Sequence, residues 1–182
     1  MPRRLDTKLS GLILIEPEVH GDERGFLVET YSAPRWREVG IDVEFVQDNH
    51  SRSRRGILRG LHFQKTPGQA KLVRCLRGRV WDVAVDLRRD SPTYRQWEGH
   101  ELDDQRHRQL FVPIGFAHGF CVLSDEADVA YKLSSVYNPD TEAGFAWDDP
   151  EVGVEWPISD PQLSERDRTA LPLAEVAGEL PW

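Results

Sequence analysis

Short segments in which apolar and polar residues alternate recur along the chain, and turn-forming residues separate them at short intervals. β-Branched and aromatic residues are frequent in these segments, as is typical of half-buried strands. We expect strands at residues 12–15, 26–31, 43–46, 59–64, 72–76, 80–87, 110–112, 119–123 and 129–136. Because no long amphipathic helix interrupts them, the pattern predicts a mainly β fold, either an antiparallel barrel or a double-sheet jelly roll.

Two short helices are expected at the periphery of this β-core. One spans residues 33–39 and ends at Gly40, and the other spans residues 165–171 and begins after Ser164 as its N-cap. No repeat, linker or break in composition marks a second domain, so residues 1–182 are expected to form one domain. A chain of this length buries roughly 70% of its surface, which suffices for a core and an enclosed pocket.

The charge of the chain narrows the class of partner. It carries 23 basic and 31 acidic residues, and the net charge of −8 argues against nucleic acid or an anionic membrane as the main partner. Nine basic residues and no acidic residue lie between His50 and Arg79, which leaves 14 basic against 31 acidic residues elsewhere, a balance of −17. This concentration of positive charge predicts a focused anion site.

No apolar run is long enough to cross a bilayer, and the first residues lack the apolar segment of a secretory signal, so we expect a cytoplasmic protein. Cys75 and Cys121 each lie within an apolar run. This setting favours reduced, buried thiols over a disulfide or a catalytic role.

One expected strand carries a histidine among small and polar neighbours. Alternation along residues 59–64 places Gly60, His62 and Gln64 on one face, and Leu61 and Phe63 on the other. A lone histidine on a strand is more often structural than functional. Here, however, Gly60 removes a side chain beside His62, which should leave room for a ligand to approach the backbone.

A second histidine, His118, follows the turn at residues 113–115, where the next strand begins. Together with His62 it resembles the histidines of cupins, whose metal-binding members supply two or three histidines and one carboxylate to the ion. Here Gln64 stands at the position of a further histidine and Lys71 at that of the carboxylate. Because an ammonium group repels a divalent cation, we expect the barrel without its metal site, and no cofactor.

The remaining groups suit the removal of a proton beside a carbonyl. Histidine is an apt base since its unperturbed pKa of about 6.5 lies near working pH, and a lysine ammonium such as Lys71 can stabilise the developing oxyanion. Tyr131 shares the inward face with Val129 and Leu133, so its phenol either packs in the core or donates a proton. Asp167, three residues after Ser164, reads on its own as a helix-capping residue.

Eleven short motifs, in order, resemble the dTDP-4-dehydrorhamnose 3,5-epimerase family, a group of metal-independent cupin enzymes. The resemblance runs from about residue 12 to residue 173. The motifs are DERGF (22–26), QDNHS (47–51), LRGLHFQ (58–64), KLVR (71–74), VAVDLR (83–88), SPT (91–93), GFAHGF (115–120), YK (131–132), YNP (137–139) with Glu142, WDDP (147–150) and LSERD (163–167). The fold that the resemblance implies is the cupin-type double-stranded β-helix, a jelly-roll barrel with a few short peripheral helices.

The resemblance also implies roles for single residues. His62 is similar to the base that removes the C3 and C5 protons beside the C4 ketone, and Asp167 to the carboxylate that orients it. Tyr131 is similar to the acid that returns a proton from the opposite face, and Lys71 to the stabiliser of the C4 enolate.

The substrate that the resemblance implies is a dTDP-4-keto-6-deoxyhexose. The residues that match the family's substrate contacts are Arg24, Phe26, Glu29, Gln47, Asn49, Arg59, His118, Tyr137 and Glu142. Arginines are apt because a guanidinium binds phosphate oxygens in a bidentate manner. In this family an N-terminal strand is contributed to a partner subunit, so a homodimer is expected in which residues 24–29 serve the neighbouring site.

Three alternatives stay open. The same set of groups would serve a mono-epimerase of an antibiotic-sugar pathway that inverts only C3 or only C5. A metal-dependent cupin oxygenase is disfavoured by Gln64 and Lys71. A sugar-nucleotide-binding cupin without activity is disfavoured because all four candidate catalytic groups are present.

Overall fold

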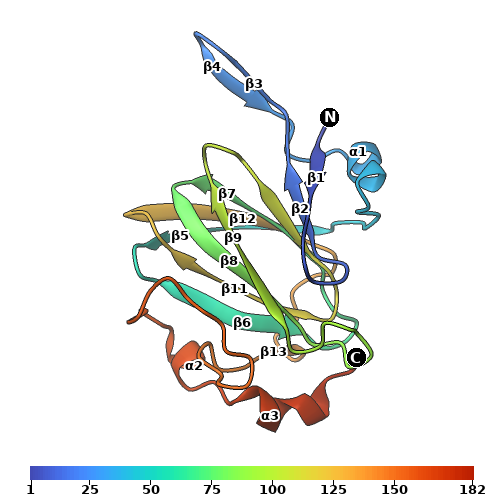
Figure 1. Ribbon diagram of the computed structural model, residues 1–182, viewed down its shortest axis with the longest axis vertical. Coiled ribbons are helices and arrows are strands. Elements are labelled where there is room, and N and C mark those ends of the chain that lie inside the picture. Colours follow the sequence, from blue (N-terminus) through green and yellow to red (C-terminus); the bar gives the residue numbers. More distant parts are fainter.

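Two antiparallel sheets face each other and form the body of the molecule, which the computed structural model describes from Met1 to Trp182 (Figure 1). The six-stranded sheet has the order β1 (Arg3–Leu5), β2 (Ile13–Glu16), β10 (Gln109–Val112), β7 (Lys71–Arg77), β12 (Glu126–Leu133) and β5 (Gln47–Arg54). The five-stranded sheet has the order β13 (Glu142–Gly144), β6 (Leu58–Gln64), β11 (Phe116–Val122), β8 (Arg79–Asp86) and β9 (Trp97–Asp103). The predicted mainly β, jelly-roll architecture is confirmed.

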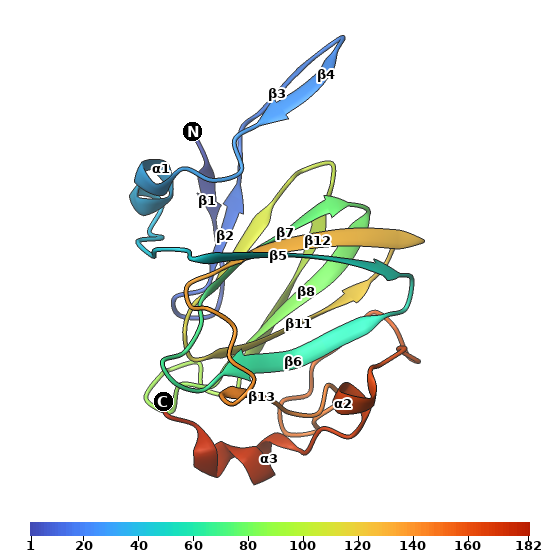
Figure 2. The same cartoon turned by 180° about the vertical axis from the view of Figure 1, so that it is seen from behind.

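The other elements lie outside this barrel. A hairpin of β3 (Val19–Asp22) and β4 (Gly25–Val28) projects away from it, and α1 (Ala33–Glu38) lies beside β1 and β2 (Figure 1). The C-terminal elements α2 (Glu165–Arg168), α3 (Leu173–Val176) and the 3₁₀ helix η1 (Ala177–Glu179) follow the outer side of the five-stranded sheet near β6 (Figure 2). None of the helices has the length and apolar character needed to cross a membrane.

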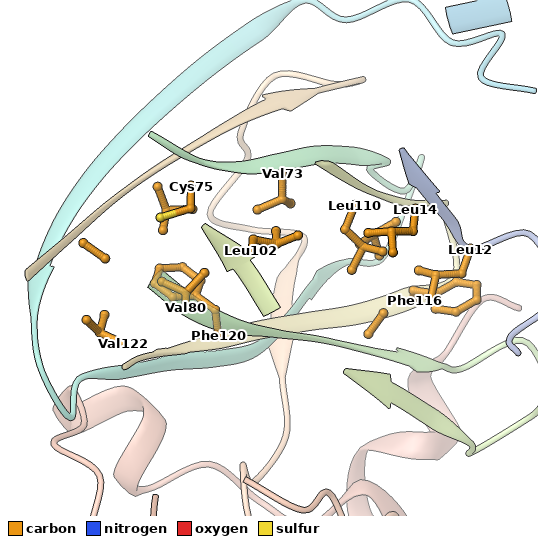
Figure 3. Close-up of a cluster of buried hydrophobic side chains, with 14 of the residues drawn as sticks. Leu12, Leu14, Val73, Cys75, Val80, Leu102, Leu110, Phe116, Phe120 and Val122 are labelled. Carbon is orange, nitrogen blue, oxygen red and sulfur yellow. The ribbon is translucent and has the colours of Figure 1, made fainter. Parts of the chain in front are cut away.

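The main core fills the space between the two sheets (Figure 3). Alternation along β11 turns Phe116, Phe120 and Val122 inward, and alternation along β8 turns Val80 and Ala84 inward. The opposite face of β6 packs against the C-terminal segment, where Leu61 and Phe63 lie in a second buried cluster with Phe145 and Leu173. The five-stranded sheet is therefore buried on its inner face by the barrel core and covered at β6 on its outer face by the C-terminal segment.

Several predicted strands are shifted, and one is wrong. Residues 43–46 form no strand, because Val43 and Phe45 pack beside Trp36 in a third apolar cluster. The strand starts instead at Gln47, and alternation could not reveal it because β5 is polar on both faces. The strand expected at 129–136 lies at 126–133, and the helix expected at 165–171 ends at Arg168, four residues before a proline.

The prediction of open space beside His62 at Gly60 is also wrong. A Cβ atom there would lie 2.5 Å from the Cα atom of Gly119 and 2.9 Å from the carbonyl oxygen of His118, so the neighbouring strand fills the space. The register between β6 and β11 shifts at this point, since His118 pairs with His62 while Phe120 pairs with Arg59. This bulge places one extra residue on β6. As a result Arg59 and His62, three residues apart, both face the interior cavity.

We expect Gly60→Ala to destabilise the fold by about 3 kcal/mol or more, since the methyl group would overpack the β6–β11 contact at a residue whose φ is +132°. Urea denaturation measures this loss in the free energy of unfolding. Gly56→Ala is the matched control, because Gly56 also has a positive φ of +81° but open space around it. A loss of about 1 kcal/mol is expected there, and equal losses for both variants would contradict the packing argument.

Candidate active site

One cavity of about 480 Å³ opens into the barrel between the sheets. Its lining residues are Ile57, Leu58, Arg59, His62, Lys71, His118, Phe120, Tyr131, Gln162, Leu163, Ser164, Arg166 and Asp167. His62 and His118 come from the five-stranded sheet, Lys71 and Tyr131 from the six-stranded sheet, and Asp167 from α2. Groups that are far apart in the sequence thus meet on facing walls of one space.

A histidine and a carboxylate form a close pair in this cavity. His62 Nε2 lies 2.5 Å from Asp167 Oδ1, and the Asp167 carboxylate is buried. Burial raises the pKa of this carboxyl, but the hydrogen bond and charge of His62 outweigh that effect and hold the pKa below its ordinary value. Asp167 is therefore an acceptor, the ring donates from Nε2, and His62 Nδ1 is left with a free lone pair.

The backbone around α2 delivers Asp167 to this position. The Asp167 amide donates to Ser164 Oγ at 3.1 Å, so the predicted N-cap is present. Just before it, the Gln162 amide donates to the Gly56 carbonyl, and the Leu58 amide donates to the Gln162 carbonyl. This parallel bridge ties the segment to the turn before β6, the strand that carries His62.

Lys71 faces the cavity without an ion pair or hydrogen bond to the protein. Burial lowers the pKa of its ammonium group to about 8, while the charges of Glu142 and Asp82 act in the opposite direction. An ammonium group in this setting is poorly hydrated, so it interacts strongly with any negative charge that develops beside it.

Tyr131 lies on the wall opposite His62. Its ring packs against the main core, with Val129 on the same face of β12. Its hydroxyl has no hydrogen-bond partner in the protein. It is not one of the fully buried polar atoms that lack a partner, since all of those belong to residues outside the cavity lining. The phenol therefore reaches open space inside the cavity, as do the unpaired nitrogens of His62 and Lys71.

A second histidine–carboxylate pair joins His118, which lines the same cavity, to Asp82. His118 Nε2 lies 3.0 Å from each carboxylate oxygen of Asp82, and both side chains are buried. Burial lowers the pKa of His118, and the charges of Lys71 and His62 lower it further against the opposing effect of Asp82. His118 is also the cross-strand partner of His62.

The basic segment contributes only part of its charge to the cavity. Five of its nine basic residues pair with acidic groups from elsewhere: Arg52, Arg55, Lys65, Arg77 and Arg79. Only Arg59 and Lys71 line the cavity. Arg59 donates from Nε to Ser53 Oγ at 3.1 Å, which leaves its two terminal nitrogens free for an anion.

Four other predicted contact residues form a chain of hydrogen bonds outside the cavity lining. Gln47 donates to Asn49 and accepts from the Tyr137 amide, both at 2.9 Å, and the Tyr137 hydroxyl donates to Glu142 at 2.8 Å. Glu142 also accepts from Arg166, which does line the cavity. The Glu142 carboxylate is therefore occupied by protein donors.

The structure does not bring Arg24, Phe26 and Glu29 to this cavity. They lie on or just after the projecting hairpin, where Arg24 pairs with Asp22 and Glu29 with Arg35. The Phe26 ring is 62% exposed, and its only aromatic neighbour is His107, with 4.6 Å between ring centroids. These residues can serve such a cavity only if the hairpin reaches another subunit.

Sequence analysis missed several residues that build the site, among them Arg166, Phe120 and Asp82. Asp82 left a detectable signal, because alternation places it on the same inward face as Val80 and Ala84 in an otherwise apolar row. A carboxylate at such a position is costly unless it is paired.

The remaining reactive groups have no place in the site. Cys75 and Cys121 are free and buried, as expected, and burial raises the pKa of each thiol to about 12. Gln64 is buried outside the cavity lining, where its side-chain oxygen accepts a hydrogen bond from Thr141. No group of three or more histidine, cysteine, aspartate or glutamate side chains is arranged to hold a metal ion.

A double-sheet β barrel that presents a paired histidine, a phenol and an ammonium group to one cavity defines a cupin-fold isomerase that works by proton transfer. The family model described as dTDP-4-dehydrorhamnose 3,5-epimerase matches residues 6–175. The chain belongs to this family, and the resemblance stated from its motifs is confirmed.

Known relatives agree with this assignment. The chain is 51% identical over 176 residues to the dTDP-4-dehydrorhamnose 3,5-epimerase of Methanothermobacter thermautotrophicus, covering 95% of each chain. It superposes with a TM-score of 0.96 on the dTDP-6-deoxy-D-glucose-3,5-epimerase of Legionella pneumophila in complex with dTDP-4-keto-L-rhamnose, at 46% identity and with 100% and 98% of the two chains covered. It is also 47% identical over 177 residues to the dTDP-4-dehydrorhamnose 3-epimerase of Streptomyces niveus, covering 95% of this chain and 86% of that one.

Proposed function

We propose that the protein inverts C3 and C5 of dTDP-4-dehydro-6-deoxy-D-glucose and forms dTDP-4-dehydro-L-rhamnose, the step that supplies dTDP-L-rhamnose synthesis. The observation that carries this proposal is the placement of the His62–Asp167 pair and Tyr131 on facing walls of one cavity, with Lys71 beside them. Inversion at a carbon needs a base on one face and an acid on the other, and this cavity supplies both.

The proposed reaction follows from these positions. His62 Nδ1 removes the proton from the carbon beside the C4 ketone, and the electron pair moves to the C4 oxygen. The Lys71 ammonium stabilises the resulting enolate, and Asp167 stabilises the imidazolium that forms. Tyr131 then gives a proton to the opposite face of the carbon, which inverts it. Proton exchange with water restores His62 and Tyr131 before the second carbon reacts.

The nucleotide end of the substrate would use the other predicted contacts. The free terminal nitrogens of Arg59 suit the diphosphate. Tyr137 is 46% exposed and is held by Gln47 and Glu142, so its ring can stack on the thymine while Asn49 and Arg166 complete this side.

We also propose a homodimer in which the hairpin of one subunit completes the site of the other. The hairpin exposes Phe26 and Leu27 to 62% and 72%, an unusual exposure for large apolar side chains on a projecting element. Such a hairpin would carry Arg24 and Glu29 to the neighbouring cavity. The cytoplasmic location expected from the sequence stays a prediction, as does the single domain.

The activity should fall on the alkaline side as Lys71 loses its proton. The ammonium form is the active one, so the rate is expected to fall tenfold for each pH unit well above the Lys71 pKa of about 8. A pH profile of kcat/KM measures this limb. Lys71→Arg keeps its charge at higher pH, so its profile should stay flat through this range at a lower overall rate. An unchanged limb in that variant would contradict the assignment to Lys71.

Turnover in heavy water tests the proposed function. Nuclear magnetic resonance of the product should show deuterium at both C3 and C5 together with inverted configuration at both carbons. Deuterium and inversion at one carbon would establish a mono-epimerase, the activity named for the Streptomyces niveus relative. Absence of turnover despite substrate binding would support a binding protein, and dependence on added iron would support an oxygenase.

A further inference from the structure

Burial of the Asp82 carboxylate in the barrel core costs free energy. It occupies an inward position on β8 between Val80 and Ala84, with 0% of its surface exposed. Its only hydrogen-bond partner is His118 Nε2, which lies 3.0 Å from both of its oxygens. Burying a carboxylate costs free energy even when it is hydrogen-bonded, so stability alone does not account for it.

The contact with Asp82 determines which nitrogen of the His118 ring carries the hydrogen. Both carboxylate oxygens are acceptors, so the nitrogen that faces them must carry the hydrogen. His118 Nδ1 has no partner in the protein and is not among the fully buried unpaired atoms, while His118 lines the cavity. The neutral ring therefore offers Nδ1 to the cavity as a hydrogen-bond acceptor.

We propose that Asp82 is a positioning residue that holds the His118 proton on Nε2, so that Nδ1 accepts a hydrogen bond from a hydroxyl group of the bound sugar. This inference rests on the proposed function for the identity of the sugar. His118 stands directly across from His62 in the β6–β11 pair, so an acceptor there holds the ring of the substrate beside the base. Asp82 acts only through its neighbours and touches no substrate.

Asp82 also supports the charge of Lys71. The charged groups that act on the Lys71 ammonium are Asp82 on β8, Glu142 on β13 and Arg166 on α2. Lys71 in turn lowers the pKa of His118 on β11. Asp82 and Glu142 are the two that favour the charged form. Removing the Asp82 charge should therefore move the alkaline limb of activity to lower pH, a change that loss of packing would not produce.

The test uses Asp82→Asn in the full-length protein. Asparagine keeps the size of the side chain but removes the charge and the strict preference for a proton on Nε2. We expect KM for the dTDP-sugar to rise by about 10-fold, as for loss of one hydrogen bond inside a binding site, with the alkaline limb displaced to lower pH. Asp103→Asn is the control, since Asp103 is a buried carboxylate that bonds only to backbone amides of a turn outside the cavity. The Asp103→Asn variant should alter thermal stability but should change neither KM nor the pH at which activity falls on the alkaline side.

Two further measurements keep the inference open to refutation if Asp82→Asn folds poorly. Asparagine at position 118 places its amide near the Nδ1 position and glutamine near the Nε2 position, so His118→Asn should retain more activity than His118→Gln. Nitrogen-15 spectra of the free protein should show His118 protonated on Nε2. A proton on Nδ1, or a parent-like KM and pH profile in a folded Asp82→Asn protein, would overturn the inference. The spectra need no substrate, so they separate its failure from failure of the proposed function.

Discussion

Replacement of His62 by asparagine is expected to lower kcat/KM by about 10²- to 10⁴-fold, the range that a general base contributes. Asparagine has no basic nitrogen at neutral pH, and its shorter side chain places the amide near the Nδ1 position rather than at the Nε2 position that meets Asp167. Deuterium from heavy water should then fail to enter either C3 or C5, since one base serves both carbons in the proposed reaction. The rate of deuterium incorporation at each carbon measures this loss.

His100→Asn provides the matched control for this variant. His100 Nε2 also lies 2.9 Å from a carboxylate, that of Glu98, but outside the cavity. Its replacement should leave kcat/KM within a factor of a few of the parent value. If His62→Asn retained exchange at only one of the two carbons, a second base would have to serve the other, and the single-base account would be wrong.

Asp167→Asn should lower kcat/KM by up to about 10⁴-fold, as expected when the partner that fixes a histidine tautomer becomes an amide. An asparagine would present either its oxygen or its amide hydrogens to His62. In the second case the ring proton moves to Nδ1, and the nitrogen that faces the cavity can no longer act as the base. Substrate affinity should change little, because the Asp167 carboxylate bonds to His62 rather than to the open cavity.

Glu165→Gln, two residues away on α2, separates the catalytic effect from helix stability. Glu165 is exposed and pairs with Arg168, so its replacement should change the free energy of unfolding by less than about 0.5 kcal/mol and leave turnover intact. Steady-state kinetics and thermal unfolding of both variants are the measurements. A similar loss of activity in both would mean that α2 itself, rather than the Asp167 carboxylate, controls the rate.

Much of the architecture could be predicted because alternation reports burial on one face of a strand. It succeeded for β7, β8 and β11, whose inward faces are mostly apolar. It failed for β5, where the more buried face carries Gln47, Asn49 and two serines, and the other face carries charged residues. Polar residues on both faces thus removed the alternation that would have located this strand.

Residues of the candidate site could be predicted where they lie in short motifs. They could not be predicted where contacts between distant segments determine their position. The residues alone predicted that Asp167 caps a helix. Only the resemblance to the family predicted that it lies next to His62. The structure shows both features, since its amide donates to Ser164 while its carboxylate meets His62. Strict alternation would place Arg59 and His62 on opposite faces of β6. The bulge that puts both on one face depends on close contact with Gly119, a residue distant in sequence.

Exchange in heavy water by Tyr131→Phe tests the central claim most directly, namely that base and acid act from opposite walls. His62 would still remove the proton, and return of a deuteron to the same face would put deuterium into recovered starting material. The account predicts continued exchange without inversion, with inverted product reduced by about 10²-fold or more. Tyr94→Phe, a phenol outside the cavity, should behave as the parent. Inversion by Tyr131→Phe at the parent rate would contradict the account.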